Sequence, residues 1–520
     1  MHKIVFGVLF GAMSLAQAAS GFVFSAEPGP HGVGLRTVQQ YDYSRTYKAR
    51  IDVLTRQPSS GERARPLQTL IWYPAAKGGA PVHYIDYLRT VATEEDFHRP
   101  AAEIDKVTST SISGIWTTLS AATIRGEEAR PMWAVRNARP AAGKFPVVIY
   151  APSFNASAHE NVDLCEYLAS QGYVVISTAA IGPHGRAMTM DLEGVEAQAG
   201  DIEFLVGYAQ SLPQADAAHI AVIGYSWGGL ANVLAAARDS RISALVSLDG
   251  SVRYFPELVR SAKYVSPERL TAPFMYIAAR PRSMEEHATR KFDMSSNLLN
   301  DIKYADFYKL TMNPMEHSNF SSEFQRFASD GDRGLDEYTR EETSLAMSWM
   351  ARYVAQFLNA YLKNDTAGLA FMANAPAKNG VPAHMLMVDR RASSGLPPTL
   401  DTFAAGLGQR GFGHASEVYA EMQKKHPDFK LGDQVLIDWG YQLLRANKVK
   451  ESIEIFKLAT IVDPKSANAF DSLAEAYQQA DDKALAIKNY QRSLELDPSN
   501  TNAVERLKTL HAGVTKPAAG

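Results

Sequence analysis

The chain has 520 residues, of which 46% are hydrophobic and 21% are charged, as is ordinary for a folded globular protein. Such a length favours about three domains rather than one small core. The formal net charge is −3, and no cluster of Lys and Arg of the kind that neutralises a phosphate backbone is present. Composition and charge therefore argue against a nucleic-acid partner.

The first residues have the organisation of a secretory signal. Lys3 supplies positive charge, residues 4–15 are apolar, and Ala16-Gln17-Ala18 has the small-x-small pattern of a cleavage site. The apolar run is shorter than the roughly 20 residues that a spanning helix needs, and no later run is long and apolar enough. We expect residues 1–18 to be a signal peptide and the protein to be periplasmic or secreted. A membrane anchor is the alternative.

Before residue 80 the sequence predicts two strands, around 37–43 and over 67–74, the second ended by Pro74. Residues 80–140 show no clear period. They are either an insertion that covers a pocket or a long surface excursion.

From residue 145 onward, short apolar runs alternate with helical patterns. This alternation predicts an α/β fold, in which a mostly parallel sheet is covered by helices on both faces. The expected strands are 146–150, 173–178, 219–224, 242–248, 273–278 and 305–310, and the expected helices are 158–170, 192–209, 229–238 and 337–362.

Cys165 is the only cysteine, so an intrachain disulfide is impossible. It lies in the helical pattern over 158–170, where we expect a small buried hydrophobic residue. A catalytic cysteine is the alternative, but neither a sharp turn nor a helix N-terminus presents this thiol.

A linker is predicted over 376–400, which is rich in Ala, Pro, Gly and Ser, and only helices are expected over 401–520. Asp463-Pro464 and Asp497-Pro498 lie 34 residues apart. This period resembles the tetratricopeptide repeat, with a degenerate earlier copy at Ala415, Tyr419 and Pro427 and a capping helix over 501–511. The resemblance implies an interaction module with a possible protein partner. It is carried by Leu436, Trp439, Gly440, Phe456 and Ala459, then by Phe470, Leu473, Ala474, Tyr477, Ala486 and Tyr490.

A candidate catalytic motif is Gly224-Tyr225-Ser226-Trp227-Gly228, which lies between a predicted buried strand and a predicted helix rich in small residues. A serine in that position is the nucleophile elbow of serine hydrolases. The flanking glycines fit a turn at which the strand and the helix approach too closely for a Cβ.

A serine nucleophile needs a base and a carboxylate that orients the base. Asp249 follows the strand 242–248, and His317 follows the last strand of the alternating region. The chain order Ser226, Asp249, His317 is therefore the order of nucleophile, acid and base found in α/β folds that carry this elbow. His184 and His287 are the rival bases. His184 is better explained as a turn or pocket residue.

Two N–H donors are needed for the oxyanion of a tetrahedral intermediate. Trp227 supplies one through its backbone, because it follows the nucleophile. The loop after strand 146–150 supplies the other, and Phe154 is preferred, with Ser153 or Asn155 as alternatives. Pro152 has no N–H.

Residues 145–320 resemble the platelet-activating-factor acetylhydrolase and dienelactone-hydrolase-like branch of the α/β-hydrolases. The resemblance implies a hydrolase domain over 19–375, with Asp249 as the acid and the base in the H-x-x-F segment His317 to Phe320. Other α/β-hydrolases take the acid one strand later, which would point to Glu285 or Glu286. Dienelactone hydrolases carry cysteine at the elbow, and Ser226 therefore argues against lactone cleavage.

We therefore expect an exported, acetylhydrolase-like serine esterase that acts on a small-molecule or lipid ester and carries a helical-repeat module. No metal or organic cofactor is implied. Two other functions stay open. One is a serine peptidase of the same fold, and the other is an inert scaffold whose repeats bind a partner.

Overall fold

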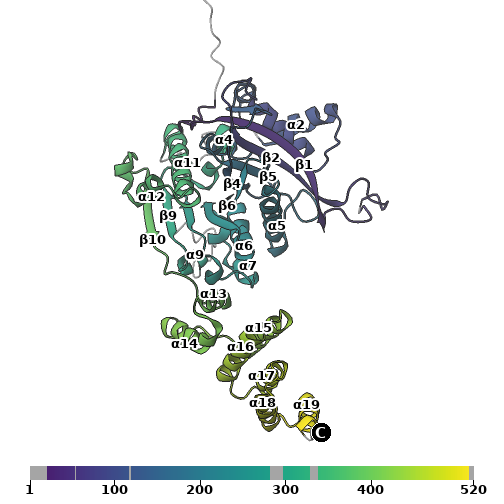
Figure 1. Cartoon of the computed structure of the whole chain (residues 1–520). Coiled ribbons are helices and arrows are strands. Elements are labelled where there is room, and N and C mark those ends of the chain that lie inside the picture. The colour runs from purple at the N-terminus through teal and green to yellow at the C-terminus, as the bar shows by residue number, and fades with distance from the viewer. Residues whose placement is uncertain (1–19, 53, 116–118, 282–296, 328–337, 515–520) are drawn as a thin grey trace, which may run out of the picture. The chain divides into compact units, whose positions relative to one another are not determined.

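The computed structural model describes residues 20–52, 54–115, 119–281, 297–327 and 338–514, with only the backbone over 113–115 and 512–514 (Figure 1). The chain divides into two compact units, Met1–Gly395 and Leu396–Gly520. The predicted signal peptide, residues 1–18, lies outside the described residues.

The first unit is built around one ten-stranded sheet with the order β10-β9-β8-β7-β6-β4-β5-β2-β1-β3. Strands β5, β4, β6, β7, β8 and β9 run parallel to one another, whereas β2 and β10 join the two ends of this block antiparallel. The strands are β1 (Gly32–Thr46), β2 (Ala64–Ala75), β3 (Ala134–Arg136), β4 (Phe145–Ala151), β5 (Val174–Thr178), β6 (Ala215–Tyr225), β7 (Ile242–Leu248), β8 (Phe274–Ala278), β9 (Phe307–Met312) and β10 (Leu386–Arg391).

Successive residues of the central strands are buried on opposite faces of the sheet, because side chains alternate along a strand. In β4, Val148 and Tyr150 pack with helices α4 (Val162–Ser170) and α11 (Arg340–Leu362). Their neighbours Val147 and Ile149 pack on the other face with α5 (Leu192–Ala209) and α6 (Gly228–Arg238). Burial on both faces explains why these strands read as continuous apolar runs. The unit also contains α7 (Pro256–Ser261), α9 (Leu298–Asp301), α10 (Ser322–Phe327) and α12 (Thr366–Ala373).

The expected strands and main helices of the α/β region are confirmed within a few residues at their ends. The predicted linker 376–400 differs from what the structure shows. Residues 386–391 form β10, which pairs antiparallel with β9 and extends the sheet. This edge strand is mostly exposed and ends in Asp389, Arg390 and Arg391, so it lacks the apolar pattern that revealed the central strands.

Residues 80–140, which the sequence left unassigned, contain short helices and strand β3. Tyr84, Tyr87 and Leu88 of the first helix are buried, but helices of five residues are too short to show a period. Strand β3 pairs parallel with β1 and so belongs to the sheet. The helices are α1 (Tyr84–Leu88), η1 (Arg89–Thr93), α2 (Ala101–Ile115) and α3 (Ala121–Glu128).

Helices alone make up the described part of the second unit. The pair α15 (Asp433–Arg445) and α16 (Val449–Val462) recurs 34 residues later as α17 (Ala467–Gln479) and α18 (Lys483–Leu496). The Tyr441 hydroxyl donates to Glu475 at 2.9 Å, a bond that joins residues one period apart. A Cβ on Gly440 would lie 2.4 Å from the Phe456 ring, so this small residue allows α15 and α16 to pack closely. The other helices are α13 (Leu400–Arg410), α14 (Ala415–Lys425) and α19 (Thr501–Val514).

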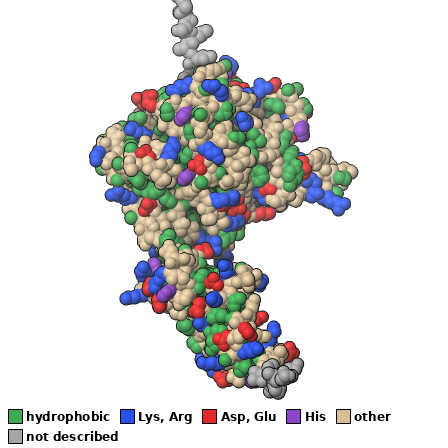
Figure 2. All heavy atoms as spheres, viewed as in Figure 1, with side chains coloured by type: hydrophobic (Ala, Val, Ile, Leu, Met, Phe, Trp, Pro, Cys, Tyr) green, Lys and Arg blue, Asp and Glu red, His purple; other side chains and the backbone are tan. Residues whose placement is uncertain are grey.

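Within the described ranges, no helix combines the length and the apolar character that a bilayer crossing requires. On the face of the molecule that Figure 2 shows, basic and acidic side chains are interspersed rather than gathered by sign.

Candidate active site

Ser226 lies at a sharp turn between β6 and α6. Its φ angle is 51°, in the left-handed region that residues other than glycine rarely adopt. The Ser226 N–H donates to the Leu248 carbonyl at 3.1 Å. The Ser226 carbonyl accepts from the N–H groups of Gly229 at 3.0 Å and Ser251 at 2.7 Å. These bonds hold a strained backbone that presents the hydroxyl at the carboxyl end of β6.

Glycines allow the segments around this turn to meet. A Cβ on Gly224 would lie 2.1 Å from the Gly228 carbonyl oxygen, and a Cβ on Gly228 would lie 2.1 Å from the Ala151 carbonyl oxygen. Both overlaps are with backbone, which cannot move aside as a flexible side chain would. The start of α6 therefore packs directly against the end of β4, and the loop after β4 is brought beside Ser226.

The three residues that the sequence proposes for catalysis form one hydrogen-bonded chain. Ser226 Oγ lies 2.9 Å from His317 Nε2, and His317 Nδ1 lies 2.7 Å from Asp249 Oδ2. Ser226 follows β6, Asp249 follows β7, and His317 begins the short helix η4 (His317–Phe320) after β9. Because these strands are parallel, their carboxyl ends share one edge of the sheet. With Nδ1 protonated toward the carboxylate, Nε2 is free to accept the serine proton.

Asp249 is fully buried, and each of its carboxylate oxygens has a donor. Oδ1 accepts from the Ala279 N–H at 3.1 Å and from the Tyr254 hydroxyl at 3.2 Å, while Oδ2 faces His317. Burial by itself raises the pKa of Asp249, but the hydrogen bond and charge of His317 outweigh it and hold the pKa below its usual value. The carboxylate is therefore ionised at neutral pH and fixes the imidazole.

His317 is held through its backbone and its neighbours. The Tyr225 hydroxyl donates to the His317 carbonyl at 2.8 Å, and the Tyr225 ring lies 5.4 Å from the imidazole. The preceding residue, Glu316, pairs with Arg280 at 2.8 Å. The His317 side chain is 36% exposed, so a substrate can reach the imidazole from solvent.

Among the three residues that the sequence proposes in the loop after β4, one N–H group is left for an oxyanion. The Ser153 N–H donates to Glu160 Oε2 at 2.9 Å, and the Asn155 N–H donates to Met188 Sδ at 3.5 Å. Pro152 has no N–H. Of the three donors that the sequence proposes in this loop, Phe154 is the one for which no partner is found among the described residues.

The second donor is at the start of α6. Trp227 is the N-cap residue of α6, where backbone N–H groups have no partner within the helix. The rings of Trp227 and Phe154 meet edge to face at 5.5 Å between centroids, so the two segments are packed together beside Ser226. The arrangement fits a two-donor oxyanion hole.

The rival residues lie elsewhere. His184 is 67% exposed and pairs with Glu193. Cys165 is fully buried in α4, and burial raises the pKa of its thiol, as expected of a packing residue rather than a nucleophile. His287, Glu285 and Glu286 lie outside the described residues.

Residues 152–155, after β4, are called the oxyanion loop below. A cavity of about 310 Å³ lies beside this loop. One wall is aliphatic and comes from α1, η1 and α2, so residues 80–140 line a pocket. Arg186 stands at the polar side, where it pairs with the buried Glu94. The complete lining is Leu88, Val91, Thr108, Ser111, Ile112, Asn155, Ala156, Ser157, Arg186 and Glu323. The sequence does not show which residues of α1 and η1 face inward, because five residues are too few to show a period.

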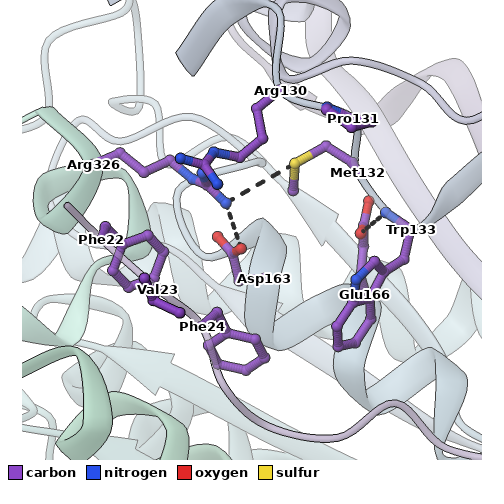
Figure 3. A pocket seen from close by; sticks show the side chains of 10 residues that line it. All are labelled: Phe22, Val23, Phe24, Arg130, Pro131, Met132, Trp133, Asp163, Glu166 and Arg326. Carbon is purple, nitrogen blue, oxygen red and sulfur yellow. Dashed lines mark hydrogen bonds and ion pairs between the residues drawn. The ribbon is translucent and has the colours of Figure 1, made fainter. Parts of the chain in front are cut away.

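A second cavity, of about 240 Å³, is walled by Phe22, Met132 and Trp133 among others (Figure 3). Neither this cavity nor the first is lined by a residue of the triad. The Arg326 guanidinium points at Asp163 in this view, and it also pairs with Glu127 at 2.8 Å. These buried charges neutralise one another and tie α10 to α3 and α4. In the part of the chain that the structure describes, no group of three His, Cys, Asp or Glu residues is placed to hold a metal ion.

Comparison with known proteins finds a similarity in the core of the first unit. Residues 133–280 match the dienelactone hydrolase family, a range that includes Ser226, Asp249 and the loop at Phe154. Among solved structures, a ferulic acid esterase from Streptomyces cinnamoneus aligns with 22% identity and a TM-score of 0.47, over 66% of this chain and 94% of that chain. No curated protein matches the chain. The family match, the parallel sheet and the serine turn support an α/β-hydrolase fold and a serine ester hydrolase.

Proposed function

We propose that the first unit is a serine esterase of the acetylhydrolase-like type. The observation that carries the proposal is the continuous chain from Ser226 Oγ through His317 to the buried Asp249. Ser226 Oγ bonds to the ester carbonyl carbon while its proton passes to His317 Nε2. Asp249 stabilises the imidazolium that forms, and the backbone N–H groups of Trp227 and Phe154 hold the oxyanion.

Collapse of the tetrahedral intermediate breaks the bond between carbon and the leaving oxygen. That oxygen takes the proton from His317 and departs as the alcohol, which leaves the acyl group on Ser226. Water then attacks the acyl-enzyme and gives its proton to His317. The second intermediate expels Ser226 Oγ, which recovers the proton, and the carboxylic acid is released.

The cavity beside the oxyanion loop is the proposed seat for the apolar part of the ester. Its aliphatic wall comes from Leu88, Val91 and Ile112. Its cation, Arg186, is already paired with Glu94, so the cavity offers no unpaired positive charge to an anionic group. This favours a neutral apolar group on the substrate, as in a small-molecule or lipid ester.

Two further parts of the proposal concern the ends of the chain. Residues 1–18 direct export, so the esterase acts in the periplasm or outside the cell. The second unit is a tetratricopeptide module that binds a protein partner, and the recurrence of α15 and α16 as α17 and α18 supports it.

The test of the esterase proposal is hydrolysis of a short-chain chromogenic ester by the purified protein and by Ser226→Ala. The proposal expects turnover by the wild type and a loss of at least roughly a thousandfold in the variant. Equal rates for the two proteins, or no turnover by a folded wild type over a series of acyl lengths, would reject it.

A further inference from the structure

A buried carboxylate lies directly behind the oxyanion loop and belongs to none of the triad residues. Glu160 is 5% exposed and stands between β4 and α4. Both of its oxygens bond to Ser153, one to the N–H at 2.9 Å and the other to the hydroxyl. The Tyr150 hydroxyl also donates to Glu160, at 3.2 Å. Ser153 immediately precedes Phe154, the proposed oxyanion donor.

The same short segment also holds the loop that carries the base. The Asn161 side-chain amide donates to the Phe320 carbonyl at 2.8 Å, and its oxygen accepts from the Ser322 N–H at 2.8 Å. The Glu160 carbonyl accepts from the Glu323 N–H at 3.1 Å. Residues 160 and 161 therefore connect the oxyanion loop to the segment that follows His317.

The donors around Glu160 match its ionised form. Three hydrogens point at the carboxylate, two from Ser153 and one from Tyr150, and an ionised carboxylate only accepts. Protonation would add a fourth hydrogen to this group and remove acceptor capacity. One of the bonds to Ser153 or Tyr150 would then have to break or reverse.

We propose that Glu160 is a positioning residue of the esterase: its carboxylate anchors Ser153 and thereby aims the N–H of Phe154 at the oxyanion. This inference rests on the proposed function. Glu160 touches no substrate in this account and acts only through the loop.

Burial of Glu160 changes the pH range over which its carboxyl group ionises. It raises the pKa of Glu160 to about 7, although the bonds from Ser153 and Tyr150 favour the ionised form. The titratable groups that face Glu160 are Tyr150 of β4, Tyr225 of β6, Cys165 of α4, His159 of the same loop and Glu323 of α10. As pH falls through about 7, Glu160 gains a proton and one of its bonds to Ser153 or Tyr150 is lost or reversed, which weakens the hold on the oxyanion loop, so kcat falls.

The chain offers a matched control in Glu166. This residue is 2% exposed, and burial raises its pKa to about 7 as well, but it bonds to the Tyr87 hydroxyl and the Trp133 N–H instead. We would compare Glu160→Gln with Glu166→Gln by kcat, KM and the pH profile of kcat for a chromogenic ester. Thermal unfolding would verify that both variants are folded.

The proposal expects Glu160→Gln to lower kcat by roughly ten- to a hundredfold with little change in KM, which is less than the loss of an oxyanion donor itself. The acid limb of its pH profile should be shallower than that of the wild type, because the variant lacks the carboxyl group of Glu160, which must be ionised in the wild type. Glu166→Gln should keep the wild-type kcat and slope. An unchanged kcat and slope in Glu160→Gln, or an equal loss in Glu166→Gln, would overturn the proposal.

If Glu160→Gln does not fold, Ser153→Ala replaces it, since this change removes one bond to Glu160 and keeps the carboxylate. It should lower kcat severalfold at unchanged KM, and an unchanged kcat would count against the proposal. Failure of the proposed function looks different, because the wild type would then hydrolyse no ester or would hydrolyse it as fast as Ser226→Ala.

Discussion

Replacing Asp249 by Asn tests the orientation of the base with almost no change in shape. An amide has one accepting end and one donating end. At Asp249, Oδ1 alone receives the Ala279 N–H, at 3.1 Å. The Tyr254 hydroxyl lies nearer to Oδ1, at 3.2 Å, than to Oδ2, at 3.5 Å, and Oδ2 also receives His317. The amide oxygen therefore belongs at the Oδ1 position, and the NH₂ group then faces Nδ1 of His317.

That orientation forces the wrong tautomer on His317. Nδ1 must accept from the amide, so the imidazole proton moves to Nε2, the atom 2.9 Å from Ser226 Oγ. Nε2 can then no longer take the serine proton. We predict a fall of about 10³- to 10⁴-fold in kcat/KM, which corresponds to roughly 4–5.5 kcal/mol of transition-state stabilisation.

The assay is steady-state hydrolysis of a chromogenic ester at neutral pH, with unfolding curves to show that the variant is folded. Asp239→Asn is the control, because Asp239 pairs with Arg241 before the start of β7, at the opposite end of that strand. It should leave kcat/KM unchanged within about twofold. Near wild-type activity of Asp249→Asn would show that Asp249 does not orient the base, and Glu285 and Glu286 would then be tested as the acid.

Three further predictions concern the backbone N–H of Phe154, the buried carboxyl group of Glu166 and the cavity that Ile112 lines. Phe154→Pro removes the proposed oxyanion N–H and should lower kcat by roughly a hundred- to a thousandfold. Phe154→Ala is the control, because it keeps the N–H and removes only the phenyl ring. Equal losses of kcat in both variants would show that the ring, and not the N–H, is responsible. Burial raises the pKa of Glu166 from 4.5 to about 7, so the wild type loses stability as pH rises through that window. The difference in unfolding free energy, Glu166→Gln minus wild type, should therefore rise by about 3 kcal/mol between roughly pH 4 and pH 8. Chemical denaturation at a series of pH values measures this difference. If it shows no such rise, Glu166 is not held neutral by its burial. Ile112→Trp adds bulk inside the cavity and should lower kcat/KM for long-chain esters by roughly tenfold or more while sparing acetyl esters; an unchanged chain-length profile would place the acyl group elsewhere.

The sequence predicted the candidate site best where its geometry is set by residues that are adjacent in the chain. A strand, a tight Gly-flanked turn and a helix are contiguous around Ser226, so the motif alone predicts this serine as the nucleophile. Asp249 and His317 could be proposed because parallel strands bring their carboxyl ends to one edge, and the structure does bring these side chains together. Phe154 was the preferred loop donor by position, and the bonds of Ser153 and Asn155 now give a physical reason.

The sequence was uninformative where position depends on tertiary contacts. Glu160 is one of many acidic residues along the chain, and only the packing of the loop against α4 shows that its carboxylate is buried behind Ser153. Strand β10 is an exposed edge, and α1 and η1 are too short to show a period. The tetratricopeptide repeats, the signal peptide and the location of the protein remain predictions.

The central claim is that the Ser226 hydroxyl becomes covalently acylated. The direct measurement is intact-protein and peptide mass spectrometry after brief reaction with an activated acetyl ester and an acid quench. We expect one added acetyl group on the peptide that contains Ser226, and no added group when Asp249→Asn or Ser226→Ala is treated in the same way. Ester turnover with no adduct on Ser226 in the wild type, or with the acetyl group on another residue, would contradict this claim.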